Sequence, residues 1–266
     1  MVMALVAGAT GKAGRETMTA LLRRDVRVRA MVRDRDRAHL PAEVETVEGD
    51  LSRPVDLERA ADGADYAFLL SGAMTPESAA AIGAAPIRRT VLLWAGYRGP
   101  VEDALAASGT EWVGLEPVSF LGNTLTWASG VRDGSTVVEP FVDVAESMVD
   151  ERDVAEVAAE VMLTDGHAGR RYSLTGAEPV SVRDRVRGLS AALGREVTLR
   201  ELTEEQARRR WSQEGYDEAL IDALVAWQQR PPAEATRVDA AVPDLLGRPA
   251  GTFAGWLGRH LDRFRR

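Results

Sequence analysis

Short apolar runs alternate with amphipathic stretches along the first half of the chain. The runs at 3–7, 26–32, 44–47, 64–70, 90–94 and 110–115 are typical of strands, and the nearly continuous ones suit a sheet covered on both faces. Helical periodicity fills the intervals, up to residue 24, at 55–61 and 76–85, and from Pro100 to a stop at Gly109. Strand-then-helix units in succession predict an α/β fold with a doubly wound parallel sheet.

Three glycines stand where the first apolar run meets the first helix. Gly8, Gly11 and Gly14 have a GxxGxxG spacing, and the strand that ends at residue 32 closes a βαβ unit. Glycine lets the backbone approach a phosphate closely, beside the positive end of a helix. The spacing and its position predict a nucleotide-binding turn, and a plain strand-to-helix connection is the alternative. A Walker-type loop does not fit, because Ala13 stands where serine or threonine would bind magnesium.

An arginine ends the second predicted strand. Arg33 stands where an acidic residue would bind the ribose 2′-hydroxyl of NAD, and an arginine there suits the 2′-phosphate of NADP. Its planar fork matches a phosphate, and Arg35 and Arg37 add positive charge. Alternatively, the charged residues 33–37 form only a solvated surface segment, or Asp34 contacts a ribose hydroxyl. The pattern favours NADP(H), with NAD(H) second.

Beyond Glu116-Pro117 the pattern becomes mainly helical. Helices are predicted at 150–163, 182–193, 204–214, 217–228 and 252–264, with a short strand at 171–174. We therefore expect a Rossmann-type NAD(P)-binding domain over residues 1–150. A smaller, mainly helical substrate-binding region is expected over 151–266, from which the chain re-enters the sheet near 171–174.

Composition narrows the class of protein further. A net charge of −8 and an isoelectric point near 5.1 argue against general affinity for nucleic acid. No apolar run reaches the length of a membrane span, so we expect a cytoplasmic protein without a membrane partner. The chain has no cysteine, and its three histidines lack metal-ligand spacing, so no metal site is expected. Lys12 is the only lysine.

Several longer motifs can be compared with known families. They are VAGATGKAG at the glycine turn, VRAMVRD around Arg33, EGDL at 48–51, VEDALAASGTEW at 101–112, FLGN at 120–123, VDERDVAEVAAEVM at 149–162, RRYSLTGAEPVS at 170–181 and LGRPAGTFAGW at 246–256. Along nearly its whole length the chain resembles the NmrA-like family of atypical short-chain dehydrogenases. That family includes NADPH-dependent quinone oxidoreductases and redox sensors.

The resemblance implies roles for particular residues. Arg33 would bind the 2′-phosphate, and Asn123 would lie near the substrate pocket. Asp50 and Leu51 would flank the adenine, although Asp50 is equally suited to cap the next helix. Leu70 and Ser71 would lie along the ribose and nicotinamide. The cofactor pyrophosphate would be held by Gly8, Thr10, Gly11, Lys12, Ala13 and Gly14.

The chain also departs from its relatives. Ordinary short-chain dehydrogenases use a Tyr-x-x-x-Lys pair, whereas Tyr97 is followed four residues later by Val101. Tyr97 is the best remaining proton donor, and a packed loop tyrosine without a catalytic role is the alternative. Trp94 stands where many relatives have serine, and Glu116 where arginine is common. A flat substrate is expected to stack on aromatic side chains at Trp94, Phe120 and Trp127, beside Asn123.

These features lead to one main functional hypothesis and two alternatives. We expect an NADPH-dependent oxidoreductase that transfers hydride to a quinone or to a polycyclic or biosynthetic-type carbonyl or enone. The absent Tyr-Lys pair also fits a non-catalytic NADP(H) sensor of the NmrA type, and a cofactor-retaining isomerase or epimerase is a third hypothesis. The partner is a small molecule, and a homodimer is left open.

Overall fold

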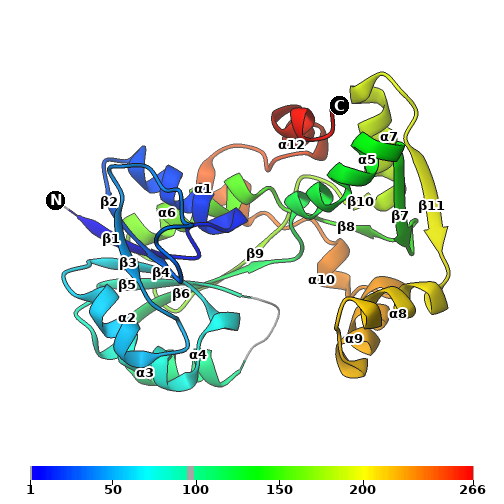
Figure 1. Ribbon diagram of the computed structural model, residues 1–266. Coiled ribbons are helices and arrows are strands. Elements are labelled where there is room, and N and C mark those ends of the chain that lie inside the picture. Colours follow the sequence, from blue (N-terminus) through cyan, green and yellow to red (C-terminus); the bar gives the residue numbers. More distant parts are fainter. Residues whose placement is uncertain (1, 95–98, 266) are drawn as a thin grey trace. The chain divides into compact units, whose positions relative to one another are not determined.

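Seven parallel strands form one sheet (Figure 1). The structure is a computed structural model that describes residues 2–94 and 99–265. The strands follow the order β3-β2-β1-β4-β5-β6-β9, with every neighbouring pair parallel. They are β1 (Met3–Ala7), β2 (Arg27–Val32), β3 (Glu45–Glu48), β4 (Tyr66–Leu70), β5 (Arg89–Leu93), β6 (Glu111–Pro117) and β9 (Arg171–Leu174). The predicted doubly wound parallel sheet is confirmed.

Helices cover both faces of this sheet. On one face α1 (Lys12–Leu22) packs against α6 (Glu151–Leu163), and on the other α3 (Pro76–Ala84) lies between α2 (Pro54–Ala61) and α4 (Pro100–Ala107) (Figure 1). Proline opens α2, α3 and α4, at a position where its missing N–H costs no helical hydrogen bond. The starts of these three helices are therefore favoured by a local feature, the proline at their first position.

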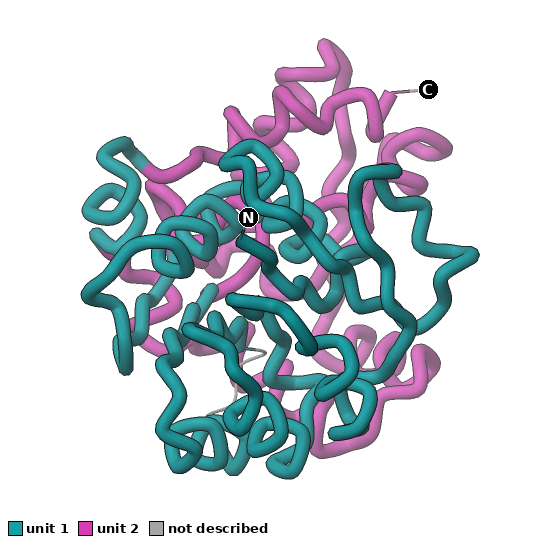
Figure 2. Tube along the Cα trace, turned by 90° about the vertical axis from the view of Figure 1, so that its left-hand side faces the viewer, with its two compact units in different colours: residues 1–117, 151–174, 240–249 teal, residues 118–150, 175–239, 250–266 magenta. Residues whose placement is uncertain are grey.

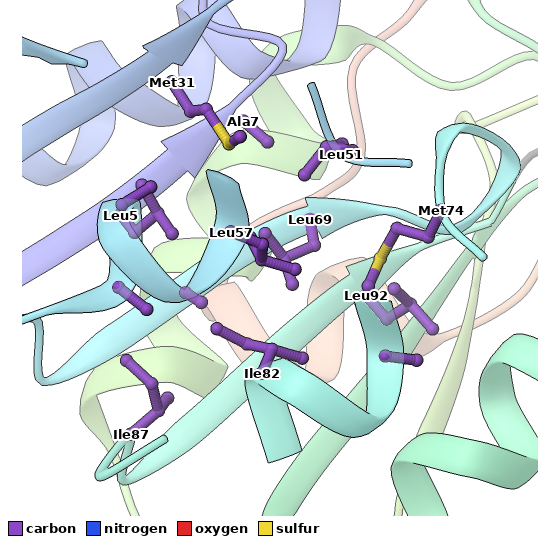
Figure 3. Close-up of a cluster of buried hydrophobic side chains, with 14 of the residues drawn as sticks. Leu5, Ala7, Met31, Leu51, Leu57, Leu69, Met74, Ile82, Ile87 and Leu92 are labelled. Atoms are coloured by element: carbon purple, nitrogen blue, oxygen red, sulfur yellow. The ribbon is translucent and has the colours of Figure 1, made fainter. Parts of the chain in front are cut away.

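The core under α2 and α3 is a layer of aliphatic side chains (Figure 3). Leu5, Leu69 and Leu92 rise from three strands to meet Leu57 and Ile82, and all five are fully buried. Burial of one such side chain is worth about 1.5–3 kcal/mol. This layer fixes the strands, and with them the loops at their carboxyl ends.

Strand order reverses between β1 and β4. β1 pairs with β2 on one side and with β4 on the other, so the connections after β1 and β4 leave in opposite directions. A crevice opens at the carboxyl ends of the strands at such a point, and nucleotides bind there in doubly wound sheets. Gly8 follows β1 and Ser71 follows β4 at this crevice.

Two compact units divide the chain, and each draws on three segments (Figure 2). Unit 1 holds 1–117, 151–174 and 240–249, apart from the residues outside the described ranges, and it contains the whole sheet. Unit 2 holds 118–150, 175–239 and 250–266, again for the described residues. Strand β9 joins the sheet at residues 171–174, beside β6. The assignment of cofactor and substrate roles to 1–150 and 151–266 stays a prediction.

Unit 2 is mainly helical, as predicted. Strands β7 (Thr136–Pro140) and β11 (Thr198–Leu202) pair in parallel, and β8 (Ala145–Glu146) pairs with β10 (Val180–Ser181). Its helical elements are η2 (Leu121–Trp127), α5 (Ala128–Gly134), α7 (Val182–Leu193), α8 (Glu204–Gln213), α9 (Glu218–Gln229), α10 (Ala233–Thr236), α12 (Phe253–His260) and η3 (Leu261–Arg263). Unit 1 holds one further helix, α11 (Ala241–Leu246). Within the described ranges, no helix is long and apolar enough to cross a bilayer.

Candidate cofactor and substrate sites

In the glycine turn, the backbones of Gly11 and Gly14 lie close to the Gly8 carbonyl. Gly8 has a φ of +64°, and the N–H of Gly11 donates to the Gly8 carbonyl at 2.8 Å. A Cβ on Gly14 would lie 2.2 Å from that same carbonyl oxygen, and one on Gly11 would lie 3.2 Å from it. Gly8 and Gly14 therefore cannot carry side chains without rearrangement of the turn.

Helix α1 presents its N-terminus at this turn. Gly11 is its N-cap and supplies no side-chain cap, and its first turn has no acidic residue. The first N–H groups of a helix have no partner within the helix, and they attract anions. Burial lowers the pKa of Lys12, while the buried Glu151 at the start of α6 opposes that shift. The turn and the helix end therefore fit a diphosphate.

Arg33 directly follows β2 and lies beside two hollows of the surface. Thr10 from the glycine turn lines the first hollow with Arg33, and Asp50 lines the second with it. In the described part of the chain Arg33 makes no hydrogen bond or ion pair, whereas Arg35 donates to the Thr46 carbonyl. The structure thus brings the predicted Thr10, Arg33 and Asp50 together.

Asp34 and Arg37 are occupied with each other and with their own loop. Asp34 Oδ1 accepts from the backbone N–H groups of Asp36 and Arg37, and Arg37 Nε lies 3.3 Å from Asp34 Oδ2. An aspartate that binds a ribose needs free oxygens directed at the sugar. Asp34 is thus held in its own loop, whereas Arg33 makes no hydrogen bond or ion pair in the described residues.

Asp50 caps the turn that follows β3. Its Oδ1 accepts from both the N–H and the hydroxyl of Ser52, each at 2.8 Å, and these bonds lower the Asp50 pKa. Arg33 and Arg53 act in the same direction. Asp50 therefore holds the turn before α2 and does not cap that helix, whose N-cap is Arg53 without a side-chain cap bond in the described residues, and contact with an adenine stays a prediction.

The remaining residues predicted along the cofactor follow β3 and β4. Leu51 is buried in the cluster of Figure 3, and Leu70 Cδ1 would lie 2.7 Å from a Cβ on Gly8. Ser71 is 7% exposed and begins a short 3₁₀ turn. Leu70, Ser71 and Gly8 therefore share the crevice at the strand-order reversal.

Unit 2 contains a cavity of about 370 Å³. Of the residues predicted to form a substrate pocket, Asn123 and Trp127 line it, whereas Trp94 and Phe120 do not. Trp94 is 7% exposed in the core of unit 1, with the Arg171 guanidinium 4.6 Å from its ring centroid. Tyr97 lies outside the described residues, and its catalytic role stays a prediction.

A buried arginine forms one wall of the cavity. Arg185 on α7 is 8% exposed, and its guanidinium lies 4.5 Å from the centroid of the Trp127 ring. Its Nη1 donates to the Thr124 hydroxyl at 2.9 Å, while its Nε has no hydrogen-bond partner among the described residues. Burial lowers the Arg185 pKa to about 10, so the side chain stays cationic at neutral pH.

Two glutamates form the acidic part of the cavity. The negative charge of Glu139 is balanced by Arg210, whose Nη2 donates to it at 2.8 Å. Glu139 also accepts from Trp127 Nε1 at 2.7 Å. Glu146 accepts from Trp227 Nε1 at 2.5 Å. Both carboxylates favour the charged form of Arg185. The cavity therefore combines two indole rings, one buried cation and two carboxylates.

Comparison with known proteins decides the family. Residues 8–96 match a family model described as NAD(P)H-binding. A (4-alkanoyl-5-oxo-2,5-dihydrofuran-3-yl)methyl phosphate reductase of Streptomyces griseus is 34% identical, over 98% of this chain and 99% of that protein. The chain belongs to the NAD(P)H-binding, NmrA-like family. An NAD(P)H azoreductase of Xenophilus azovorans is 30% identical over the same shares of the two chains.

Solved structures show the same fold for this NmrA-like protein. An NADPH-dependent quinone oxidoreductase of Escherichia coli has a TM-score of 0.78 at 22% identity and covers 97% of this chain and 99% of its own. A Citrobacter sp. triphenylmethane reductase, crystallised with NADP(H), has a TM-score of 0.74 at 18% identity, covering 96% of this chain and 98% of its own. Such identities establish the fold alone.

Family membership confirms the resemblance and the broad activity. This NmrA-like protein is an NAD(P)H-dependent oxidoreductase. The glycine turn that the sequence singled out lies within the matched residues 8–96. The individual roles of the site residues remain predictions, since no ligand contact tests them.

Sequence reasoning missed most of the cavity of this NmrA-like protein. Arg185, Glu139, Glu146 and Trp227 come from four separate elements, and none stands in a recognisable motif. One signal was present for Arg185. It falls on the buried face of α7, where Val186 and Leu189 share its stripe, and a charge inside an apolar stripe marks an unusual environment.

Proposed function

We propose that this NmrA-like protein is an NADPH-dependent reductase of a quinone or of a biosynthetic-type conjugated carbonyl or enone. The observation that carries the cofactor preference is Arg33, which lines the same hollow as Thr10 of the glycine turn and makes no hydrogen bond or ion pair in the described part of the chain. The two relatives at 30% identity or more are a furanone phosphate reductase and an azoreductase. Their names support reduction of a conjugated small molecule.

In this proposal the chain holds the cofactor through groups of the crevice. The first N–H groups of α1 and Lys12 bind the diphosphate, and Arg33 binds the 2′-phosphate with its planar fork. NAD(H) is less well served, because the oxygens of Asp34 already serve its own loop. Leu70 and Ser71 line the path toward the nicotinamide.

The bound nicotinamide supplies the hydride, so the protein needs no nucleophile. The cavity of unit 2 serves as the substrate pocket in this proposal, with Trp127 and Asn123 in its lining. Its two indole rings suit a flat, conjugated acceptor, and its charged groups are Arg185, Glu139 and Glu146. Tyr97 remains the proposed proton donor.

NADPH oxidation tests the proposal directly. The assay follows the nicotinamide absorbance with a panel of quinones, cyclic enones and an azo dye, and NADH is run in parallel. Turnover that favours NADPH supports the reductase. Binding of NADPH without turnover of any acceptor would overturn it in favour of the sensor, and product formed without net NADPH loss would favour an isomerase.

Cellular setting and assembly belong to the same proposal. We place the protein in the cytoplasm, where NADPH and small-molecule substrates meet it, without a nucleic-acid or membrane partner. The homodimer left open by the sequence is a matter for light scattering after size-exclusion chromatography. A mass twice the 28.8 kDa of the chain would establish it.

A further inference from the structure

We infer that Arg185 and Glu146 form a two-point anchor for the substrate in the cavity of unit 2. Arg185 donates to a carbonyl oxygen, and Glu146 accepts from a hydroxyl or N–H group of the same molecule. The preferred substrate is accordingly a neutral conjugated carbonyl compound that carries a hydrogen-bond donor, and not a phosphorylated one. This inference rests on the proposed function, because it assigns the substrate class of the same site.

The donors of Arg185 are mostly unused by the protein. A guanidinium has five N–H groups, and in the described part of the chain only the bond from Nη1 to Thr124 engages one. Arg185 also has no ion-pair partner there. A buried cation without acceptors is costly, and a ligand that supplies an acceptor removes that cost. The side chain lines the cavity, so the missing acceptor has room to bind.

The indole of Trp127 fixes the direction of this cation. The central carbon of the guanidinium lies over the ring, 4.5 Å from its centroid, and the ring is held in turn by its bond to Glu139. The N–H groups of a guanidinium lie in its plane, so a ligand acceptor binds at its edge. An edge-on approach suits the in-plane lone pairs of a carbonyl oxygen.

Glu146 supplies the complementary acceptor. One of its oxygens accepts from Trp227, and in the described residues no bond engages the other. Unlike Glu139, it has no arginine partner there. Glu146 therefore offers a charged acceptor to the cavity, and a charge-assisted bond from a substrate donor is among the stronger hydrogen bonds.

Charge balance separates a neutral substrate from a phosphate. The lining holds one cation, Arg185, and two carboxylates, of which Glu139 is neutralised from behind by Arg210. A phosphate dianion would gain one arginine but would face the carboxylate of Glu146 at close quarters. Like charges in a partly buried cavity repel strongly because solvent screens them poorly. An alcohol at the same place would donate to Glu146 instead.

Exposure of Trp227 supports a ligand at this position. Trp227 is 40% exposed although its Nε1 is held by Glu146, and Leu224 of the same helix lines the cavity beside it. A large indole held at a cavity wall provides a flat surface for a conjugated ring. The anchor and the two indoles together define a slot for a planar molecule.

A matched series of three compounds tests the anchor. They are a (4-alkanoyl-5-oxo-2,5-dihydrofuran-3-yl)methyl phosphate, the corresponding alcohol and its methyl ether. Each is titrated into protein loaded with NADP⁺, and binding is followed by quenching of tryptophan emission, since Trp127 and Trp227 line the cavity. The alcohol is expected to bind at least tenfold more tightly than the phosphate or the ether.

Two variants separate the two anchor points. Glu146→Gln keeps an acceptor for Trp227 but loses the charge, so the advantage of the alcohol over the ether should fall by about tenfold. The phosphate should bind this variant more tightly than it binds the wild type. Arg185→Lys keeps the charge but loses the fork, and all three compounds should bind at least tenfold more weakly. The matched controls are Glu178→Gln and Arg200→Lys, which change exposed residues outside the cavity lining.

Tighter binding of the phosphate by the wild type would overturn the inference. So would an unchanged alcohol-to-ether ratio in Glu146→Gln, or failure of all three compounds to bind. NADPH oxidation is measured separately on the same series. The expected binding pattern without oxidation would leave the anchor standing and remove the reductase proposal, whereas oxidation with the phosphate preferred would do the reverse.

Discussion

Two helical glycines meet opposite surroundings, although both lie in regular backbone. An added Cβ on Gly14 in α1 would lie 2.2 Å from the Gly8 carbonyl oxygen and 3.0 Å from that of Ala7. On Gly258 in α12 it would meet nothing within 4 Å. Close packing of the helix against the turn requires glycine at position 14. At position 258 only helix propensity distinguishes glycine from alanine.

Alanine at these two positions should therefore act in opposite directions. Gly14→Ala forces the turn to shift, and we expect a loss of about 1–3 kcal/mol in stability with NADPH affinity at least tenfold weaker. Gly258→Ala should raise stability by about 0.5–1 kcal/mol and leave NADPH affinity unchanged. Urea unfolding and NADPH titration check both. Wild-type affinity in Gly14→Ala would show that the turn does not hold the cofactor.

Arg33 offers a second prediction for a single residue. Arg33→Ala should reduce the preference for NADPH over NADH at least tenfold, because a charge-assisted bond is worth about 1.5 kcal/mol or more. Arg27→Ala at the exposed start of the same strand is the control and should leave the ratio unchanged. The ratio of kcat/KM, or of Kd where turnover is absent, is the measurement. An unaltered ratio in Arg33→Ala would remove this residue from the 2′-phosphate site.

Helix α7 shows how one element positions a wall of the unit 2 cavity. It begins with a capping box in which Ser181 Oγ accepts from the Asp184 N–H and Asp184 accepts from the N–H and hydroxyl of Ser181. The bond from the Ser181 hydroxyl is the main cause of a lowered Asp184 pKa. Because Arg185 directly follows Asp184, the cap that fixes the first turn of α7 also fixes the backbone position of Arg185.

The cap gives α7 a stability that depends on pH. A carboxyl whose pKa is lowered by folding stabilises the folded state while it is ionised. That contribution is complete above its ordinary pKa of 3.8 and is lost as the pH falls through the lowered folded value. Asp184→Ala should therefore cost about 1 kcal/mol at neutral pH, and the difference from wild type should shrink in acid.

Urea unfolding of wild type and Asp184→Ala at several pH values checks this. Asp133→Ala is the control, since Asp133 is exposed on α5 and caps no helix. A difference that stays constant down to strongly acid pH would mean that the ionised Asp184 is not the stabilising species.

At the scale of the whole molecule, unit 1 is assembled from segments far apart in the sequence. Helix α6 buries nine of its thirteen residues, among them Val154, Val157 and Val161, and it packs along α1. Arg24 Nη1 of the α1 C-terminus lies 2.7 Å from Glu156 of α6. The sheet therefore depends on a helix that lies beyond residue 150.

Fragments of the chain should reflect this assembly. A fragment of residues 1–150 lacks α6 and β9. On one face of the sheet α1 then loses its neighbouring helix, so the fragment should not unfold cooperatively. A fragment of residues 1–174 restores both elements and should recover a cooperative transition. Thermal circular dichroism of the two distinguishes them. Equal cooperativity in the shorter fragment would show that the first 150 residues form an independent domain.

Sequence patterns predicted the sheet well and the cavity of unit 2 poorly, for physical reasons. Buried parallel strands and a glycine turn are local features, so β1, β4 and the positions of Gly8 and Gly14 could be read from neighbouring residues. The cavity lining spans residues 119–228 and arises from tertiary packing. Half-exposed strands such as β11 also escaped notice, because TLREL alternates only weakly between apolar and polar positions.

Lys12 in the glycine turn is the only lysine of the chain, so it is a specific site for chemical labelling. Lys12 is partly exposed, and its lowered pKa leaves more of its amine deprotonated at neutral pH than in an ordinary lysine. Amine-selective acylating reagents therefore find one lysine side chain, in the glycine turn. Peptide-resolved mass spectrometry separates label on Lys12 from label on the N-terminal α-amine, and bound NADPH is expected to reduce the labelling of Lys12.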